Sequence, residues 1–390
     1  MGRNVGISST FPDFCAEAAQ KSGLICIKDL KTKNYYLLMS QKTHLQARDV
    51  LKGSQLYFWR AIQYVTFLIG TFIFLALIFY PTLGIHAFWN ILIPLAPLLL
   101  VLVPGLWRNI CPLSFISILP HRLKISRKKR LKVASQGKFM LAGVIVLYLI
   151  LPLRHIMLDT SGPATAAVLF LLGIIAFWVG VKYEWKSGWC SGLCPVHPVE
   201  KLYGSTPKVS FPNAQCTTCK NCVIPCPDSS PNTHPLVQLK TPSHRLAGIL
   251  LLGGFPGFIW GWFHVPDYYG LEGLAQIAMA YGLPLLGMTV TLSIFYLLYQ
   301  NISQKHTLAL FRVFAMAAVV CYYWYRLPAL IGFGMFPGDG MLVDLSQWLP
   351  EYISYILQGT TLFFFSWCLL WKRNVAVSWK IKPPFDSRKA

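Results

Sequence analysis

Charged residues are scarce in this chain, and acidic ones are the scarcest. Only 13% of its 390 residues are Asp, Glu, Lys or Arg, whereas 55% are hydrophobic, and the mean hydropathy is +0.50. Soluble globular domains carry about 25% charged residues, so the composition excludes an ordinary soluble enzyme and predicts a polytopic membrane protein. The 14 acidic residues oppose 35 Lys and Arg, which leaves a net charge of +21.

The basic excess lies in the connections between apolar segments. No aromatic residues interleave with it in a pattern that reads nucleic acid, so we expect no nucleic-acid partner. Within one connection, residues 122–132 alone include seven basic residues, Arg122, Lys124, Arg127, Lys128, Lys129, Arg130 and Lys132. The opposite turns carry acidic residues instead, namely Asp159, Asp267, Glu272, Asp339 and Asp344. The positive-inside rule then predicts that the basic connections and both termini are cytoplasmic.

The first forty residues contain no charged-then-apolar signal peptide with a small-residue cleavage site. Membrane insertion is therefore expected to begin with the first transmembrane helix.

Of the eleven cysteines, those that cluster lie on the predicted cytoplasmic side. Thiols stay reduced in the cytoplasm, so disulfides are not expected there.

Eight apolar windows are long enough to cross a bilayer, which takes about 20 residues per helix. They lie near 57–79, 88–106, 139–158, 163–181, 246–264, 274–299, 307–330 and 349–371. The prediction is an all-α polytopic membrane protein with about eight transmembrane helices and a small ferredoxin-like iron–sulfur loop domain on the cytoplasmic face. Its expected parts are a cytoplasmic segment (1–55) with a β-hairpin over Ile25 to Met39, two transmembrane hairpins with a basic loop (56–184), the iron–sulfur loop (185–242), four further helices (243–373) and a basic tail (374–390).

The iron–sulfur loop is predicted from a C-x-x-C-x-x-C-x-x-x-C-P run, formed by Cys216, Cys219, Cys222, Cys226 and Pro227. Paired C-x-x-C units also occur in zinc ribbons. Four cysteines this closely spaced and ended by Cys-Pro favour a 4Fe-4S cluster. In the bacterial ferredoxin spacing, three of these thiolates bind one cluster and the fourth usually binds a different one. The run therefore requires further ligands elsewhere in the chain.

An internal repeat supplies them. The first two transmembrane helices lead into Trp107-Arg-Asn-Ile-Cys111-Pro112, and the next two lead into Cys190-Ser-Gly-Leu-Cys194-Pro195. The second is C-x-x-x-C-P, and the first is the same motif with Trp in place of its first Cys. Each hairpin is thus expected to bring thiols to the membrane face that carries the ferredoxin run.

These motifs resemble those of the membrane-bound polyferredoxins of the NapH and NosR type, which are related to the CcoG (RdxA/FixG) oxidase-assembly proteins. The resemblance covers roughly residues 57–240. It implies a bacterial inner-membrane protein with one or two 4Fe-4S clusters, which passes electrons between the quinone/quinol pool and a redox partner protein. The alternative implied by the same family is an assembly or maturation factor for a respiratory metalloenzyme, or a redox sensor. The outer loop at Thr160–Thr165 is too short for a flavin domain, so FMN is not expected.

Carried over by position, the family pattern assigns eight cluster ligands to Trp107, Cys111, Cys190, Cys194, Cys216, Cys219, Cys222 and Cys226. This chain supplies seven thiols. Ferredoxin crossover would group Cys194 with Cys216, Cys219 and Cys222, leaving Cys111, Cys190 and Cys226 one ligand short. A substitute ligand (His121, His197 or Asp228), a three-iron cluster and the loss of one cluster all remain open.

Protonatable residues near the outer ends of the helices are candidates for quinone binding, because ionisable groups within membrane spans are commonly functional. They are Arg154, His155 and His264, with His86 and Arg326 nearby. Snorkelling and ordinary interfacial packing explain the same residues equally well. The hydrocarbon core is about 30 Å thick, so an outer quinol site would need a relay to clusters on the inner face. Haem between His155 and His264 is one such relay, although no spacing requires it; an inner site near Trp107 and Trp178 needs none.

Overall fold

The computed structural model describes two compact units, 1–46 and 47–390. The described residues are 25–28, 35–38, 51, 53–129, 131–184, 186–204, 207–209, 211–212, 214–215, 241–268, 273–303 and 306–371. Cys216, Cys219, Cys222 and Cys226 lie outside them, as do Asp228 and the basic tail. The predicted ferredoxin-like loop is therefore outside the described part of the chain.

The first unit contains an antiparallel β-hairpin of β1 (Ile25–Lys28) and β2 (Tyr35–Leu38), in which Ile25 pairs with Leu38 and Lys28 with Tyr35. Both strands are rich in β-branched or aromatic residues, which favour extended backbone. The hairpin predicted over this segment is confirmed.

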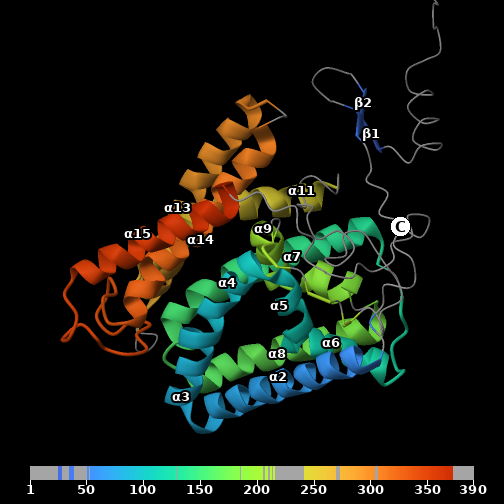
Figure 1. The fold of residues 1–390 in the computed structure, drawn as a ribbon, viewed down its shortest axis with the longest axis horizontal. Helices are drawn as coiled ribbons and strands as arrows, with labels where there is room; N and C mark the ends of the chain where they lie inside the picture. The colour runs from blue at the N-terminus through green and yellow to red at the C-terminus, as the bar shows by residue number, and fades with distance from the viewer. Residues whose placement is uncertain are drawn as a thin grey trace, which may run out of the picture. The chain divides into compact units, whose positions relative to one another are not determined.

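The second unit is helical, and eight of its described helices are long and apolar enough to cross a membrane, as the hydropathy predicts. They are α2 (Gly53–Phe79), α3–η2–α4 (Pro81–Ile85, His86–Leu92, Ile93–Leu102), α7–η3 (Val133–Leu153, Arg154–Leu158), α8 (Gly162–Lys182), α11–η5–α12 (Pro242–Ile249, Leu250–Gly254, Phe255–Phe263), α13 (Leu274–Asn301), α14 (Thr307–Leu330) and α15–η7 (Tyr352–Ser366, Trp367–Trp371). Figure 1 shows α2 and α8 side by side, and these two helices are in contact.

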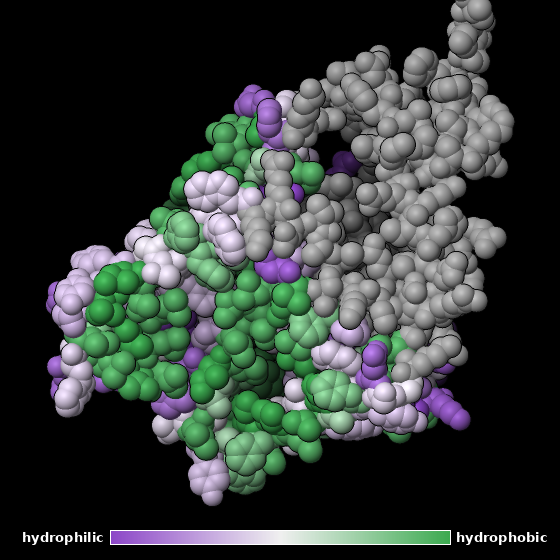
Figure 2. Space-filling model, viewed as in Figure 1, coloured by the Kyte–Doolittle hydropathy of each residue, from purple (hydrophilic) through white to green (hydrophobic). Residues whose placement is uncertain are grey.

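Many large apolar side chains point outward from these helices. Phe72 on α2, Leu297 on α13 and Phe363 on α15 are each at least 60% exposed, and Figure 2 shows apolar surface over much of the helical unit. Such surface is stable when lipid covers it, because lipid tails are as apolar as the side chains. The second unit is therefore a multi-pass membrane protein in contact with lipid.

Close contacts between backbones hold some of the helices together. Gly257 on α12 faces Gly287 on α13, and a Cβ built on either glycine would collide with the other's carbonyl. Small residues at such crossings let two membrane helices approach closely. Bulkier residues would separate α12 from α13.

Short helices lie between the spans at one end of the unit. α5 (Pro104–Ile110) and α6 (Pro112–Arg122) follow α4, whereas η4 (Lys186–Leu193) and α9 (Val196–Tyr203) follow α8. At the same end, Lys208 N–H donates to the Leu102 carbonyl, and the Lys208 ammonium donates to the Cys368 carbonyl of η7. We call this the cysteine end. The turns at the other end also meet one another, since Tyr268 N–H donates to the His155 carbonyl.

Several membrane spans contain π-helical turns instead of continuous α-helix. Trp89 and Asn90 lie in η2, Arg154 and His155 in η3, and Cys190 in η4. π-Bulges often mark functional positions because they re-aim side chains out of the α-helical register. Of these turns, η3 and η4 carry residues that line the two cavities described next.

Candidate functional site

Three cysteines from two separate parts of the chain meet at the cysteine end. Cys111, Cys190 and Cys194 line one cavity. Its walls also include Trp107, Arg108, Ser114, Trp189, Val196, His197 and Glu200. The two motifs of the sequence repeat thus deliver their thiols to a common space, which we call the cysteine cavity.

Each Cys-Pro motif begins a helix. Cys111 is the N-cap of α6, with Pro112 at the first helical position, and Cys194 stands directly before Pro195, the N-cap of α9. Proline suits these positions because the first N–H groups of a helix have no carbonyl partner within it. The free N–H groups of Leu113 and Ser114 bond to the Cys111 sulfur, and those of Val196 and His197 bond to Cys194.

Burial and these N–H groups act in opposite directions on the thiols. Burial raises the pKa of Cys111 to about 11, while the N–H groups of Ser114 and Leu113 lower it. Burial likewise raises the pKa of Cys194, and the nearby Cys190 and Cys111 raise it further. Without a cation the thiols are neutral. Bound iron would favour the thiolates, which the helix N-termini are already oriented to stabilise.

Cys190 reaches the cavity from η4, where its thiol donates to the Ser114 hydroxyl over 3.9 Å. The end of η4 is inserted deeply against α7. A Cβ at Gly143 would lie 2.9 Å from the Leu193 carbonyl oxygen and 3.3 Å from that of Cys194. Gly143 is ten residues into α7, so the Cys194 backbone lies well inside the span and not at its edge.

A buried ion pair forms the polar wall of the cavity. The Arg108 guanidinium donates to Glu200 Oε1, and both side chains are at most 7% exposed. Burial alone would raise the pKa of Glu200, but Arg108 and then His197 lower it to about 2. His197 Nδ1 stands 3.8 Å from Glu200 Oε2. Burial lowers the pKa of His197, so its imidazole is neutral.

The structure distinguishes among the residues considered as replacements for the missing eighth cluster ligand. Trp107 and His197 both line the cysteine cavity. His121 does not; its Nε2 contacts the Tyr183 carbonyl at 3.2 Å and the Ser126 hydroxyl at 3.1 Å. Asp228 lies outside the described residues.

The chain that leads to the ferredoxin run is attached beside this cavity. The Asn109 side chain donates to the Pro212 carbonyl at 2.7 Å and accepts from Ala214 N–H at 3.2 Å. Ala214 and Gln215 are buried. Asn109 is two residues from Cys111, and Ala214 is two residues from Cys216. The described chain before the run therefore ends, at Gln215, close to the helix that carries Cys111.

Within the described residues, no group of three His, Cys, Asp or Glu side chains is close enough to hold a single metal ion. A zinc site of these residues would require that spacing. The ligands of a cubane each bind a different iron, so they do not have to converge on a single point. The thiol-lined space with N–H donors to sulfur fits an iron–sulfur cluster.

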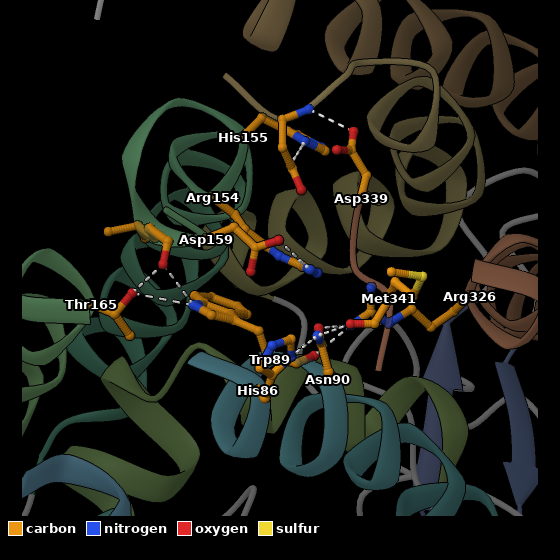
Figure 3. A network of polar contacts seen from close by, with 12 residues as sticks. His86, Trp89, Asn90, Arg154, His155, Asp159, Thr165, Arg326, Asp339 and Met341 are labelled. Atoms are coloured by element: carbon orange, nitrogen blue, oxygen red, sulfur yellow. Dashed lines mark hydrogen bonds and ion pairs between the residues drawn. The ribbon is translucent and has the colours of Figure 1, made fainter. Parts of the chain in front are cut away.

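A second, charged cavity lies near the other end of α7. Among its lining residues are Arg154, His155, Asp267, Arg326 and Asp339, with an apolar wall of Trp262, Phe263, Tyr325, Met335 and Phe336. Figure 3 shows His155 and Asp339 on one side of this network and Arg326 on the other. Two of the predicted quinone-binding residues, Arg154 and His155, are therefore brought together here.

Arg154 and His155 are held by different carboxylates. Arg154 Nη2 donates to Asp159 Oδ2 at 2.8 Å, and its guanidinium lies 5.1 Å from the ring centroids of Trp89 and Trp262. His155 Nδ1 is 2.5 Å from Asp267 Oδ1. The other ring nitrogen of His155, Nε2, is buried without a hydrogen-bond partner in the described part of the chain. It is free to bond a ligand in the cavity.

Arg326 connects this network to the second span. Its Nη2 donates to the Trp89 carbonyl at 2.8 Å and to Asn90 Oδ1 at 2.6 Å. The Asn90 amide in turn contacts His86 Nδ1 and donates to the Met341 carbonyl, each at 2.9 Å. Four membrane spans and the loop before α15 are thus joined by buried hydrogen bonds, which makes the cavity walls rigid.

The three carboxylates differ in proton affinity. Burial acts to raise the pKa of Asp159, but Arg154 lowers it to about 2. For Asp267, burial outweighs the hydrogen bond from His155 and raises the pKa. Burial also raises the pKa of half-buried Asp339 to about 6. Asp339 Oδ2 accepts from Asp267 N–H at 2.8 Å, so a carboxyl that titrates near neutral pH lies beside the His155–Asp267 pair.

His264, the third predicted quinone residue, does not line the charged cavity. Its ring lies 4.2 Å from that of Trp260, and its Nδ1 bonds the Trp260 carbonyl at 2.7 Å. Sequence reasoning missed Asp267 and Asp339 as site residues, because acidic residues in turns were interpreted only as orientation signals. No sequence feature indicated that Trp262 would be a site residue.

The two cavities are closer than the bilayer is thick. The Cys194 backbone contacts α7 at Gly143, and Arg154 lies eleven residues further along that helix. Eleven helical residues span about 17 Å, against about 30 Å for the hydrocarbon core. Buried aromatic side chains occupy the space beside this part of α7, with the Tyr148 ring 4.6 Å from Phe258.

Comparison with known proteins finds no relative: no protein-family model, curated protein or solved structure matches the chain.

Proposed function

We propose that this protein is a membrane electron-transfer protein of the polyferredoxin type, which passes electrons between the quinone/quinol pool and a redox partner through 4Fe-4S clusters. The observation that carries the proposal is the convergence of Cys111, Cys190 and Cys194 on one cavity. Packing alone gives no reason for three thiols, from two copies of one motif, to face the same space.

The cysteine cavity and the ferredoxin run together would hold the clusters. Cys111, Cys190 and Cys194 supply thiolates from the membrane hairpins, and Cys216, Cys219, Cys222 and Cys226 supply them from the run. An iron–sulfur cluster contributes one-electron transfer at a potential that burial and N–H···S bonds adjust. The protein contributes the N–H groups at the starts of α6 and α9. It also contributes the Arg108–Glu200 pair, whose opposite charges cancel in the cavity wall.

The charged cavity would bind the quinone headgroup. Its aromatic and aliphatic wall suits a flat ring, while His155 Nε2 offers a bonding position for a ring oxygen. Asp267 orients His155, and Asp339 stands where a proton could leave toward water. The separation of about 17 Å along α7 favours transfer without an added haem. The basic connections at the cysteine end support, through the positive-inside rule, the proposal that the redox partner docks at the cytoplasmic face of a bacterial inner membrane.

Purified full-length protein in lipid nanodiscs tests the proposal under anaerobic conditions. We expect bound iron and sulfide, with an absorbance band that bleaches when a short-chain hydroquinone is added. Cys194→Ser should lose iron, whereas Cys368→Ser should not, because Cys368 in η7 does not line the cysteine cavity. Equal iron loss in both variants would refute the ligand assignment, and an iron-loaded protein that no hydroquinone reduces would refute quinol oxidation.

A further inference from the structure

The cysteine cavity has one place without a thiol. Where the second hairpin has Cys190, the first has Trp107, and this indole lines the cavity. Indole nitrogen is only a hydrogen-bond donor and has no lone pair to give to iron. Among the described residues, the fourth ligand of a cluster held here by Cys111, Cys190 and Cys194 would therefore have to be a side chain of another kind.

Three further side chains with donor atoms line the cavity, namely Ser114, Glu200 and His197. Ser114 accepts a hydrogen bond from Cys190, and Glu200 pairs with Arg108. His197 differs from both. It is 2% exposed, and its Nε2 makes no hydrogen bond within the described part of the chain. A buried polar group without a partner is costly, so a bound ligand would remove that cost.

Spacing and orientation also single out His197. Cys194-Pro-Val-His197 has the same two-residue gap as the C-x-x-C pairs of the ferredoxin run, a gap that lets both residues bind one cubane. His197 Nδ1 faces the Glu200 carboxylate at 3.8 Å. Carboxylates beside one nitrogen of a metal-binding histidine commonly hold the ring so that the other nitrogen meets the metal. Arg108 fixes Glu200 in turn.

We propose that His197, through Nε2, is the fourth protein ligand of the iron–sulfur cluster held by Cys111, Cys190 and Cys194. The assignment rests on the proposed function, since it presupposes a cluster in the cysteine cavity. It makes this centre a three-thiolate, one-imidazole site. Imidazole is neutral where thiolate is negative, so the centre should be easier to reduce than an all-thiolate cubane, as histidine ligation also does in Rieske centres.

The test compares three variants of the full-length protein with the unmodified protein, all loaded anaerobically with iron and sulfide. His197→Ala removes the ligand, His197→Cys restores four thiolates, and His121→Ala removes a buried histidine at the same end that does not line the cavity. Pulsed EPR of the reduced samples measures nitrogen hyperfine coupling, and a redox titration measures the midpoint potential.

We expect an iron-bound imidazole nitrogen coupling in the unmodified protein and in His121→Ala, and its loss in both His197 variants. His197→Cys should keep the iron and shift the midpoint potential to a lower value. A coupling that persists without His197, or an unmodified cluster with no such coupling, would overturn the ligand assignment while leaving the electron-transfer proposal intact. Protein that binds no iron under any loading condition would overturn both.

Discussion

The stability contributed by the buried Arg108–Glu200 ion pair can be predicted from the structure and measured. Both side chains are at most 7% exposed, and the guanidinium contacts the carboxylate directly. Glu200→Gln removes the negative charge with little change of shape and leaves Arg108 buried opposite a neutral amide. Breaking a buried ion pair in this way costs about 3–5 kcal/mol of stability.

The pKa of Glu200 gives an independent magnitude. It falls from 4.5 to about 2 in the folded protein, because Arg108, His197 and Lys201 together outweigh burial. Each pKa unit corresponds to about 1.4 kcal/mol, so the ionised Glu200 carboxylate contributes on the order of 3 kcal/mol. The folded pKa is depressed, so this contribution is fully present above pH 4.5 and is lost as the pH falls toward 2. At neutral pH we therefore expect Glu200→Gln to lower the free energy of unfolding by about 3 kcal/mol.

Unfolding by SDS in mixed micelles, followed by circular dichroism, measures this difference. The double variant Arg108→Leu with Glu200→Leu is the control, because it removes both charges and should recover most of the loss. The gap between the unmodified protein and Glu200→Gln should narrow below pH 4.5. A loss under 1 kcal/mol at pH 7, or a double variant less stable than the single one, would show that the pair is not stabilising as described.

Three further variants test other parts of the structure. His155→Asn should weaken binding of a hydroquinone analogue about tenfold, the cost of one hydrogen bond, whereas His264→Asn should not, and equal effects would contradict the charged cavity as the site. Gly257→Ala should destabilise the protein by about 1–3 kcal/mol, because the added Cβ overpacks against α13. The control Gly282→Ala should not, because nothing lies within 4 Å of its added Cβ. Thermal unfolding of both variants measures the difference. Burial raises the pKa of Asp339 from 3.8 to about 6, so the contribution of Asp339 to stability falls as the pH rises through that range. Unfolding midpoints measured over a pH series should show this fall in the unmodified protein and not in Asp339→Asn.

The eight spans could be predicted because the bilayer imposes a length and a composition on any helix that crosses it. The windows near 57–79 and 307–330, for example, correspond to helices Gly53–Phe79 and Thr307–Leu330. The hairpin at Ile25 was equally local, since its strands carry their own β-propensity. Proline after Cys111 and Cys194 marks two places where no helix can simply continue, and helices begin at both.

Local pattern did not predict the depth of the cysteine cavity or the composition of the charged one. The π-helical turns that aim Asn90, His155 and Cys190 inward have no sequence signature. His155 and His264 looked equivalent in the sequence, yet only His155 faces the cavity, because side-chain direction there depends on how η3 and α12 pack. Asp267 and Asp339 joined the site only when two distant turns met.

The sequence by itself determined that eight helices of the described chain are long and apolar enough to cross a membrane, and that helices begin at two Cys-Pro motifs, because hydrophobic length and helix-start chemistry act over a few residues. Only the tertiary structure decided that Cys111 meets Cys190 and Cys194, that His197 stands among them in place of His121, and that Gly143 admits the η4 segment into the span. Those outcomes depend on contacts between residues far apart in the chain, which no local spacing encodes.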